Sequence, residues 1–195
     1  MTTDRLPTLL EEIRHCRLCE EHLPLGPNPV VRAAESARLL IVGQAPGTRV
    51  HESGIPWNDP SGDRLRDWLQ MDRETFYDES RIAIIPMGFC YPGRGKGGDL
   101  PPRPECAATW HQRLLAQLPD LQLTLLVGQY AQRHYLPHRY GSLTENVRHY
   151  RDALPTGYLP LPHPSPRNTL WLRQRPWFEA EVVPELRKQV KRALA

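Results

Sequence analysis

The chain has 195 residues, a formal net charge of +3 at neutral pH and 39% hydrophobic residues. This length suits one domain with a full hydrophobic core, so we expect residues 1–195 to form a single domain. No run approaches the roughly 20 apolar residues that span a bilayer, and the first residues lack the layout of a signal peptide. The composition therefore argues against a membrane-spanning chain, and we expect a cytoplasmic protein that is a monomer.

Basic residues gather toward the carboxyl end of the sequence. From Ser165 onward, seven arginines and lysines stand against three glutamates. Such a cluster fits either an anionic partner such as nucleic acid or the solvated face of a helix, and the sequence leaves both open.

Turn-forming residues divide the chain into alternating segments. Thr8 with Glu11 three residues later predicts a capping box for a first helix, which ends at Cys16–Cys19. Apolar spacing predicts further helices at 61–71, 104–118, 129–136 and 176–194, the last with a bend at Pro184. Apolar runs predict strands at 38–42, 81–86, 121–127 and 157–161. Strands that alternate with helices indicate an α/β fold with a mostly parallel sheet.

The run Leu39–Val42 leads directly into a turn, Gly43–Gly47, with the sequence Gly-Gln-Ala-Pro-Gly. A short apolar run that ends in turn-formers is typical of a strand buried on both faces of a parallel sheet. Glycine permits close backbone approach and proline stiffens the turn. Ligands of open α/β sheets bind outside the carboxyl ends of the strands, so this turn is a candidate site.

Other loops with unusual polar content follow the predicted strands. The segment 48–60 is polar and irregular, 91–103 is rich in Gly, Pro and basic residues, and His163–Asn168 follows the last strand. The carboxyl ends of parallel strands meet at one edge of a sheet, so we expect these loops to converge on one site.

The four cysteines are Cys16, Cys19, Cys90 and Cys106. A disulfide framework is not expected in a cytosolic protein. Four thiolates can hold a tetrahedral zinc ion or an iron–sulfur cluster, whereas four unrelated buried cysteines would need no ligand. The spacing alone leaves these alternatives open.

Three pieces of the sequence together resemble the uracil-DNA glycosylase superfamily, most closely its class with a four-iron, four-sulfur (4Fe-4S) cluster. The Gly43–Gly47 turn, followed by Gly54, Pro56, Trp57 and Gly62, is similar to the first motif of that class. The four cysteines stand where the class has its cluster ligands, and His163-Pro164-Ser165 looks like its third motif. The resemblance covers nearly the whole chain.

The resemblance implies a three-layer α/β/α sandwich around a central, mostly parallel four-stranded sheet. It also implies a protein that binds DNA containing a damaged or deaminated base, flips that base into a pocket and cleaves its N-glycosidic bond. Trp57 stands where the family has an aromatic that stacks on the base. His163 would donate a hydrogen bond to the negative charge that develops on the base. The implied cofactor is a 4Fe-4S cluster, with zinc as the alternative.

Two residues depart from the family pattern. The class usually has Glu at the position of Gln44, and glutamine cannot act as a base, although its amide can orient a water. The second motif normally offers an Asn at the position of Pro86, to read the edge of the base. A site that loses such a group loses discrimination, by factors up to ~10⁴.

The segment 51–59 holds replacements for these missing groups. We expect Asp59 and His163 to be the working pair, with Gln44 placing a water or contacting the base; Glu52 is the alternative carboxylate. Asn58 is expected to read the base edge, while Ser165 and Arg167 contact phosphate, as do Arg94, Lys96 and Arg103 from the long loop. The remaining predicted contacts to the substrate come from the turn residues Gly43, Ala45, Pro46 and Gly47.

Two functions compete with base excision. Gln44 and Pro86 favour a protein of the same fold that binds damaged or single-stranded DNA without cleaving it. A hydrolase of free nucleosides or nucleotides is the third interpretation. Steep salt dependence of DNA affinity would separate the second from the third, because it reports phosphate contacts.

Overall fold

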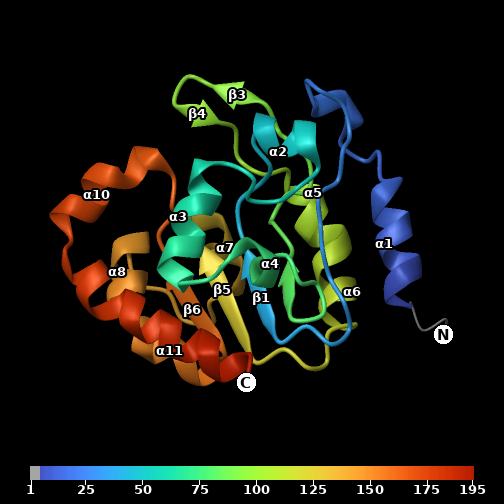
Figure 1. The fold of residues 1–195 in the computed structure, drawn as a ribbon. Coiled ribbons are helices and arrows are strands. Elements are labelled where there is room, and N and C mark those ends of the chain that lie inside the picture. The colour runs from blue at the N-terminus through green and yellow to red at the C-terminus, as the bar shows by residue number, and fades with distance from the viewer. Residues whose placement is uncertain (1–4) are drawn as a thin grey trace.

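A computed structural model describes residues 5–195 and contains a central four-stranded sheet in the order β2-β1-β5-β6 (Figure 1). The strands are β1 (Leu39–Val42), β2 (Ile82–Ile84), β5 (Leu123–Val127) and β6 (Tyr158–Leu161). All three strand pairs are parallel, and β1 pairs with both β2 and β5. The predicted α/β fold is confirmed, and each strand falls within its predicted range.

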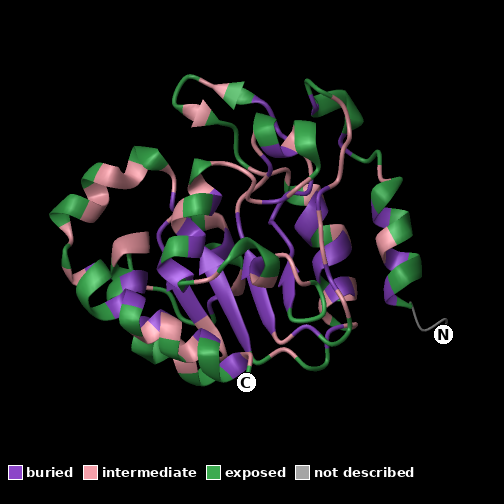
Figure 2. Cartoon of the chain, in the orientation of Figure 1, coloured by how far each residue is buried: buried purple, intermediate pink, exposed green. Residues whose placement is uncertain are grey.

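The sheet has two buried faces because alternate side chains of each strand point in opposite directions. In β1, Leu39 and Ile41 belong to one hydrophobic cluster and Leu40 and Val42 to the other, and all four are at most 1% exposed. Figure 2 shows this buried sheet between layers of helices whose outer faces are exposed. These are the three layers that the resemblance implies.

The first cluster packs the sheet against the helices on one side. They are α3 (Pro60–Leu69), α4 (Arg73–Phe76), α8 (Leu143–Arg148), α9 (Tyr150–Ala153) and α11 (Val183–Ala193), with the π-helical turn η5 (Phe178–Val182) before α11. The C-terminal helix continues from η5 into α11 without a break, because Val182 at the junction is itself helical. Its α-helical pattern is interrupted by the π-helical turn shortly before Pro184.

The second cluster covers the opposite face. Its helices are α1 (Leu6–Arg14), α7 (Gln129–Tyr135) and the continuous stretch of α5 (Pro104–Cys106), η2 (Ala107–His111) and α6 (Gln112–Leu115). The predicted capping box is wrong: α1 begins two residues before Thr8, with a proline in its first turn and no side-chain cap. Proline is well suited to the first turn, because its missing N–H would be unpaired there anyway.

Several short elements lie outside the predicted helices and strands. They are η1 (Glu20–His22), α2 (Thr48–Ser53), the β-hairpin of β3 (Arg94–Gly95) and β4 (Gly98–Asp99), η3 (Leu154–Thr156), η4 (Pro166–Asn168) and α10 (Thr169–Gln174). The hairpin stands at one end of the molecule, beside α2 in Figure 1. Within residues 5–195, no helix has both the length and the apolar character needed to cross a lipid bilayer.

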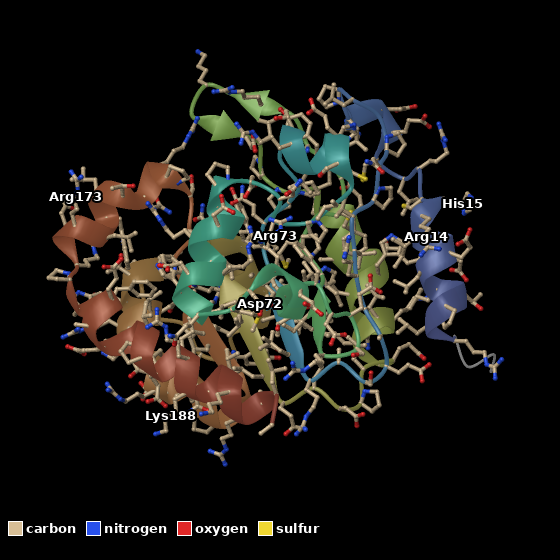
Figure 3. All side chains as sticks on the ribbon, viewed as in Figure 1. Arg14, His15, Asp72, Arg73, Arg173 and Lys188 are labelled. Carbon is tan, nitrogen blue, oxygen red and sulfur yellow. The ribbon has the colours of Figure 1, made fainter. Side chains whose placement is uncertain are left out.

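The basic cluster near the carboxyl end lies on exposed helix surface. Figure 3 shows Arg173 on α10 and Lys188 on α11 projecting outward from the body of the protein. Both are exposed, and Leu186 and Val190 form the buried side of α11. These exposed cations are accessible to solvent and to an anionic partner alike, so both interpretations of the basic cluster stay open.

A buried pair of amide side chains joins the last two strands to the helices behind them. Gln132, 1% exposed, donates from Nε2 to the carbonyl oxygens of Leu161 at 2.9 Å and Leu126 at 3.3 Å. Its Oε1 accepts from Nδ2 of Asn146 at 3.1 Å, and Oδ1 of Asn146 accepts from the backbone N–H of Tyr140 at 2.7 Å. The pair fixes the ends of β5 and β6 relative to α7 and α8.

We predict that Gln132→Leu lowers the free energy of unfolding by about 1–3 kcal/mol, because it leaves the Asn146 amide without its acceptor. Urea unfolding measures this difference. The control is Gln112→Leu on the exposed side of α6, which should change stability by no more than about 0.5 kcal/mol. Equal stability of the two variants would contradict the role given to the buried pair.

Candidate functional site

A cavity of about 600 Å³ lies at the carboxyl edge of the sheet. The chain passes from β1 to β2 on one side and returns to β5 on the other, so the order of connection reverses between β1 and β5. Such a reversal opens a crevice outside the strand ends. Gly43 after β1, Gln129 after β5 and His163 after β6 all line this cavity.

Most of the predicted site residues meet in this cavity, although they come from distant parts of the sequence. Of the predicted catalytic and substrate-binding residues, those that line it are Gly43, Gln44, Ala45, Pro46, Gly47, Trp57, Asp59, His163, Ser165 and Arg167. Asn58 lies outside the lining, and so does Glu52, the alternative carboxylate.

The loop after β6 holds His163 in a defined hydrogen-bonding state. The backbone N–H of Ser165 donates to Nδ1 of His163 at 3.1 Å, and Nδ2 of Asn168 donates to the His163 carbonyl oxygen at 2.8 Å. A neutral ring whose Nδ1 accepts carries its proton on Nε2, so this bond assigns the tautomer. Burial lowers the pKa of His163 to about 4, although the Asp59 carboxylate acts in the opposite direction. At neutral pH the ring is therefore an uncharged donor.

Trp57 forms the wall beside this histidine. The ring centroids of Trp57 and His163 are 5.6 Å apart, and the ring planes are inclined by 32°. The Trp57 indole lies against Gly43 of the turn, where an added Cβ would come within 2.8 Å of the indole. The glycine of the first motif thus makes room for the aromatic ring.

Asp59 both caps a helix and lines the cavity. As the N-cap residue of α3, it accepts a hydrogen bond at Oδ1 from the backbone N–H of Gly62 at 2.8 Å. It also lines the cavity. A carboxylate at a helix N-terminus is stabilised by the capping bond and by the helix dipole.

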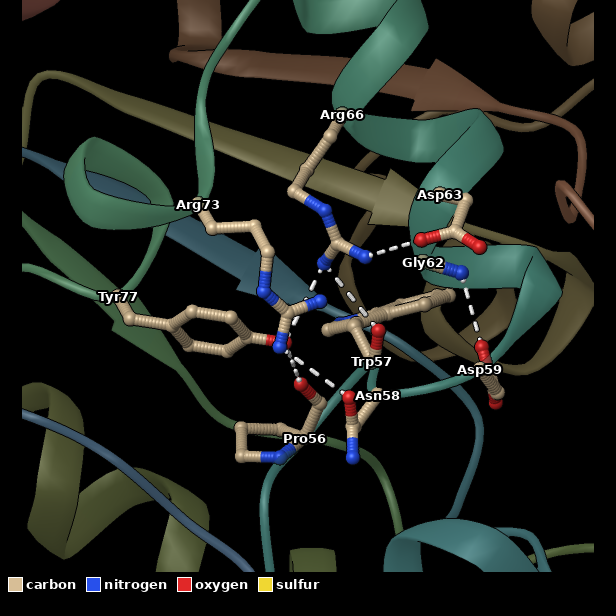
Figure 4. A network of polar contacts seen from close by, with 9 residues as sticks. All are labelled: Pro56, Trp57, Asn58, Asp59, Gly62, Asp63, Arg66, Arg73 and Tyr77. Carbon is tan, nitrogen blue, oxygen red and sulfur yellow. Dashed lines mark hydrogen bonds and ion pairs between the residues drawn. The ribbon is translucent and has the colours of Figure 1, made fainter.

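Asn58 is turned away from the cavity. Its Oδ1 accepts a hydrogen bond from Nη2 of Arg73 at 3.2 Å, as Figure 4 shows. The expectation that Asn58 reads the edge of a base therefore lacks the geometry it needs, and Asn58 takes no part in the function proposed below.

The two departures from the family pattern both lie at the cavity. The backbone carbonyl of Gln44 accepts from the N–H of Gly88 at 2.9 Å, whereas its side chain makes no hydrogen bond to another residue of 5–195 and is available to a ligand. The carbonyl of Pro86 accepts from Nε2 of His111 at 2.8 Å. His111 is 1% exposed, and burial lowers its pKa to about 4. Pro86 thus offers the cavity an apolar ring.

Arg167 lines the cavity as expected and also contacts the hairpin, while its contact with phosphate stays a prediction. It donates from Nη1 to the carbonyl oxygen of Gly97 at the tip of the hairpin, and an added Cβ on Gly98 would lie 2.3 Å from the same nitrogen. Arg167 thus connects the loop after β6 to the β3–β4 hairpin. Arg94 of the hairpin lines the cavity, whereas Lys96 and Arg103 do not.

Sequence reasoning missed further residues of the lining. Asp99 and Gly98 reach it from the hairpin, Gln129 from the start of α7 and Asn168 from η4. Asn168 closely follows the His-Pro-Ser motif and was within reach of the sequence argument. Gly98 and Asp99 belong to the loop 91–103 that was expected at the site, but no motif singles out these two residues within it.

The four cysteines, far apart in sequence, line one small separate cavity. Burial raises the pKa of the Cys90 thiol to about 11 and that of Cys106 to about 12. Among residues 5–195, no three His, Cys, Asp or Glu side chains are placed to hold a metal ion. A single zinc ion needs four sulfurs around one point, whereas a 4Fe-4S cluster takes each thiolate at a different iron. The four thiols gathered at this small cavity match the number of ligands that either group uses.

The fold and the cavity define an α/β protein whose parallel sheet carries a cavity of about 600 Å³ at its carboxyl edge. Residues 31–187 match the family model described as the Uracil DNA glycosylase superfamily. The match spans well over half of the chain, and the protein belongs to this superfamily. Its motifs after β1 and β6 are the two segments that the cavity brings together.

We predict that His163 contributes to the pH dependence of stability. Its pKa of about 4 in the folded protein lies below the ordinary value of 6.5, so the unfolded chain takes up the proton first as pH falls. The associated stability is complete above pH 6.5 and is lost as the pH falls toward 4.

Urea unfolding of the wild type and of His163→Gln at several pH values across this window tests the prediction. The variant should lose less stability than the wild type between the upper and the lower pH, because glutamine does not titrate. Equal losses in the two proteins would show that the ring is not held neutral by the fold.

Proposed function

We propose that this protein cleaves the N-glycosidic bond of uracil or another deaminated base flipped out of DNA. Membership of the superfamily suggests a DNA glycosylase-like function and a DNA substrate. The observation that carries the proposal is the convergence of Trp57, His163 and Asp59 on one cavity at the sheet edge. An extruded base needs an aromatic wall, a donor for its developing charge and a group that assists the attack of water.

His163 is the proposed donor to the base. Cleavage of the bond leaves negative charge on the base and positive charge on the sugar. A neutral imidazole with its proton on Nε2 stabilises such an anion by a hydrogen bond without first having to lose or gain a proton. The hydrogen bond from Ser165 and the low pKa of the ring support this role.

Asp59 and Gln44 are proposed to act on the sugar side. The Asp59 carboxylate supplies negative charge for the oxocarbenium-like sugar and accepts a proton from the attacking water. Gln44 orients that water or contacts the base through its amide, since its side chain is available in the cavity. This arrangement places the carboxylate at Asp59, later in the same motif than the position of Gln44, where the class that the sequence resembles has glutamate.

A second candidate is a protein that binds damaged or single-stranded DNA without cleaving it. Pro86 favours it, because an apolar ring stands where the family has an amide that reads the base. The assay described next separates the two functions, since a binding protein retains the oligonucleotide with salt-dependent affinity but leaves every base attached.

We predict that the protein releases a base from at least one labelled oligonucleotide in a panel carrying uracil, hypoxanthine or xanthine. Asp59→Asn should slow that release by about 10²-fold or more, because asparagine cannot accept the proton. Asparagine is as good an N-cap as aspartate, so the variant should unfold at the same temperature as the wild type. Full activity of Asp59→Asn would remove the carboxylate from the mechanism, and no release from any substrate would favour the binding protein.

We also propose that Cys16, Cys19, Cys90 and Cys106 hold a 4Fe-4S cluster with a structural role. Such a cluster would join the segment after α1 to both ends of the stretch 90–106, which includes the hairpin at the cavity. Metal ligation by residues far apart in sequence stabilises the fold in this way.

We predict that the protein purified without oxygen is brown, with broad absorbance near about 400 nm. Changing any one of the four cysteines to alanine should abolish this absorbance and lower the unfolding temperature. Leu18→Ala, which alters the same small cavity but keeps all four thiols, is the control and should keep the colour. A colourless protein with one equivalent of zinc would contradict the cluster.

A further inference from the structure

The backbone of Trp57 adopts a conformation that side chains rarely take. Its φ is +58°, and among residues 5–195 the only other non-glycine residue with positive φ is Gln70, which ends α3. Left-handed backbone is common at a helix end but costs free energy for a bulky aromatic residue inside a loop. Trp57 keeps this conformation only if its surroundings exclude the alternatives.

Glycine packing is the first of these surroundings. An added Cβ on Gly62 would lie 1.7 Å from the carbonyl oxygen of Trp57, so the start of α3 presses directly on its backbone. On the other side, Gly43 presses on the indole. This packing supplies no hydrogen-bond donors, so the carbonyl groups of Pro56 and Trp57 must find donors elsewhere.

Two side chains supply these donors, as Figure 4 shows. Arg66 of α3 donates from Nη1 to the carbonyl oxygen of Trp57 and to the hydroxyl of Tyr77, both at 3.2 Å. The Tyr77 hydroxyl donates in turn to the carbonyl oxygen of Pro56 at 2.7 Å. The two carbonyls on either side of the left-handed residue are thus bound to one connected pair of side chains.

Arg66 is a buried charge whose ion pair within α3 compensates only part of the cost of its burial. Arg66 is only 5% exposed, yet its one ion-pair partner, Asp63 at 2.8 Å, is largely exposed to solvent and compensates the charge weakly. Burial of the arginine charge costs free energy unless the guanidinium is paired and its N–H groups find hydrogen-bond acceptors. Here the hydrogen bonds to Trp57 and Tyr77 compensate the burial, together with the Phe76 ring, whose centroid lies 5.1 Å from the Arg66 guanidinium carbon.

Neither Arg66 nor Tyr77 lines the base cavity, so neither can touch a bound base. We propose that Arg66 and Tyr77 are positioning residues that hold the Trp57 ring at the distance and tilt that a flipped base needs for stacking. This proposal depends on the function proposed above in one respect, which is that the ligand stacked on Trp57 is a base. The positioning itself is a property of the free protein.

The first experiment requires no substrate. The protein is labelled with 5-fluorotryptophan, and the ¹⁹F resonance of Trp57 is assigned with Trp57→Phe. Tyr77→Phe should shift or broaden this resonance, and Arg66→Leu should do so as well if it folds. Tyr140→Phe is the matched control, because its hydroxyl bonds Asp152 away from the cavity, and it should leave the resonance unchanged. An unchanged Trp57 resonance in Tyr77→Phe would overturn the proposal.

The second experiment asks whether Tyr77 acts through Trp57. Tyr77→Phe should reduce base release by roughly 10-fold in the wild-type background, since small misplacements in a site are costly. In the Trp57→Ala background the same change should have almost no effect, because the ring that it positions is gone. Equal reductions in both backgrounds would show a general structural role and overturn the proposal. Where the wild type releases no base, the proposed excision fails and the fluorine experiment alone decides the positioning.

Discussion

The parallel pairing of β1 with both β2 and β5 is the constraint on which the rest of the structure depends. Parallel strands end at the same edge, so the turn after β1 and the loop after β6 meet although more than a hundred residues separate them. Both faces of β1 are buried, which fixes the strand in the middle of the sheet and leaves only its carboxyl end free for chemistry. The cavity is a consequence of this topology before any of its side chains is considered.

Side chains around the cavity also hold its loops in place by donating hydrogen bonds to main-chain carbonyl groups. Arg66 and Tyr77 bind the carbonyls beside Trp57, His111 binds that of Pro86, and Asn168 binds that of His163. Buried carbonyl groups must find donors, so each such bond also fixes the segment that carries the carbonyl. Arg66, Tyr77 and His111 lie outside the cavity lining and yet help to determine the shape of the cavity.

The sequence predicted the sheet and the two motif loops well, because their signals are local. Apolar runs that end at glycine mark β1 and β5 wherever they fold, and the His-Pro-Ser motif marks the end of β6. The sequence did not reveal the partners of Asn58 and Arg167: Arg73 binds the Asn58 side chain outside the cavity lining, and Arg167 binds the hairpin with one of its N–H groups. Both outcomes depend on partners brought close only by folding, which spacing along the chain cannot reveal.

The carboxylate of Asp59 has one role in the fold and another in the proposed chemistry. Its side chain begins α3, and the same side chain faces the cavity. Asparagine satisfies the helix as well as aspartate does, whereas only aspartate carries charge. On the proposed assignment, one exchange of oxygen for nitrogen turns a base-removing enzyme into a receptor for the same lesion.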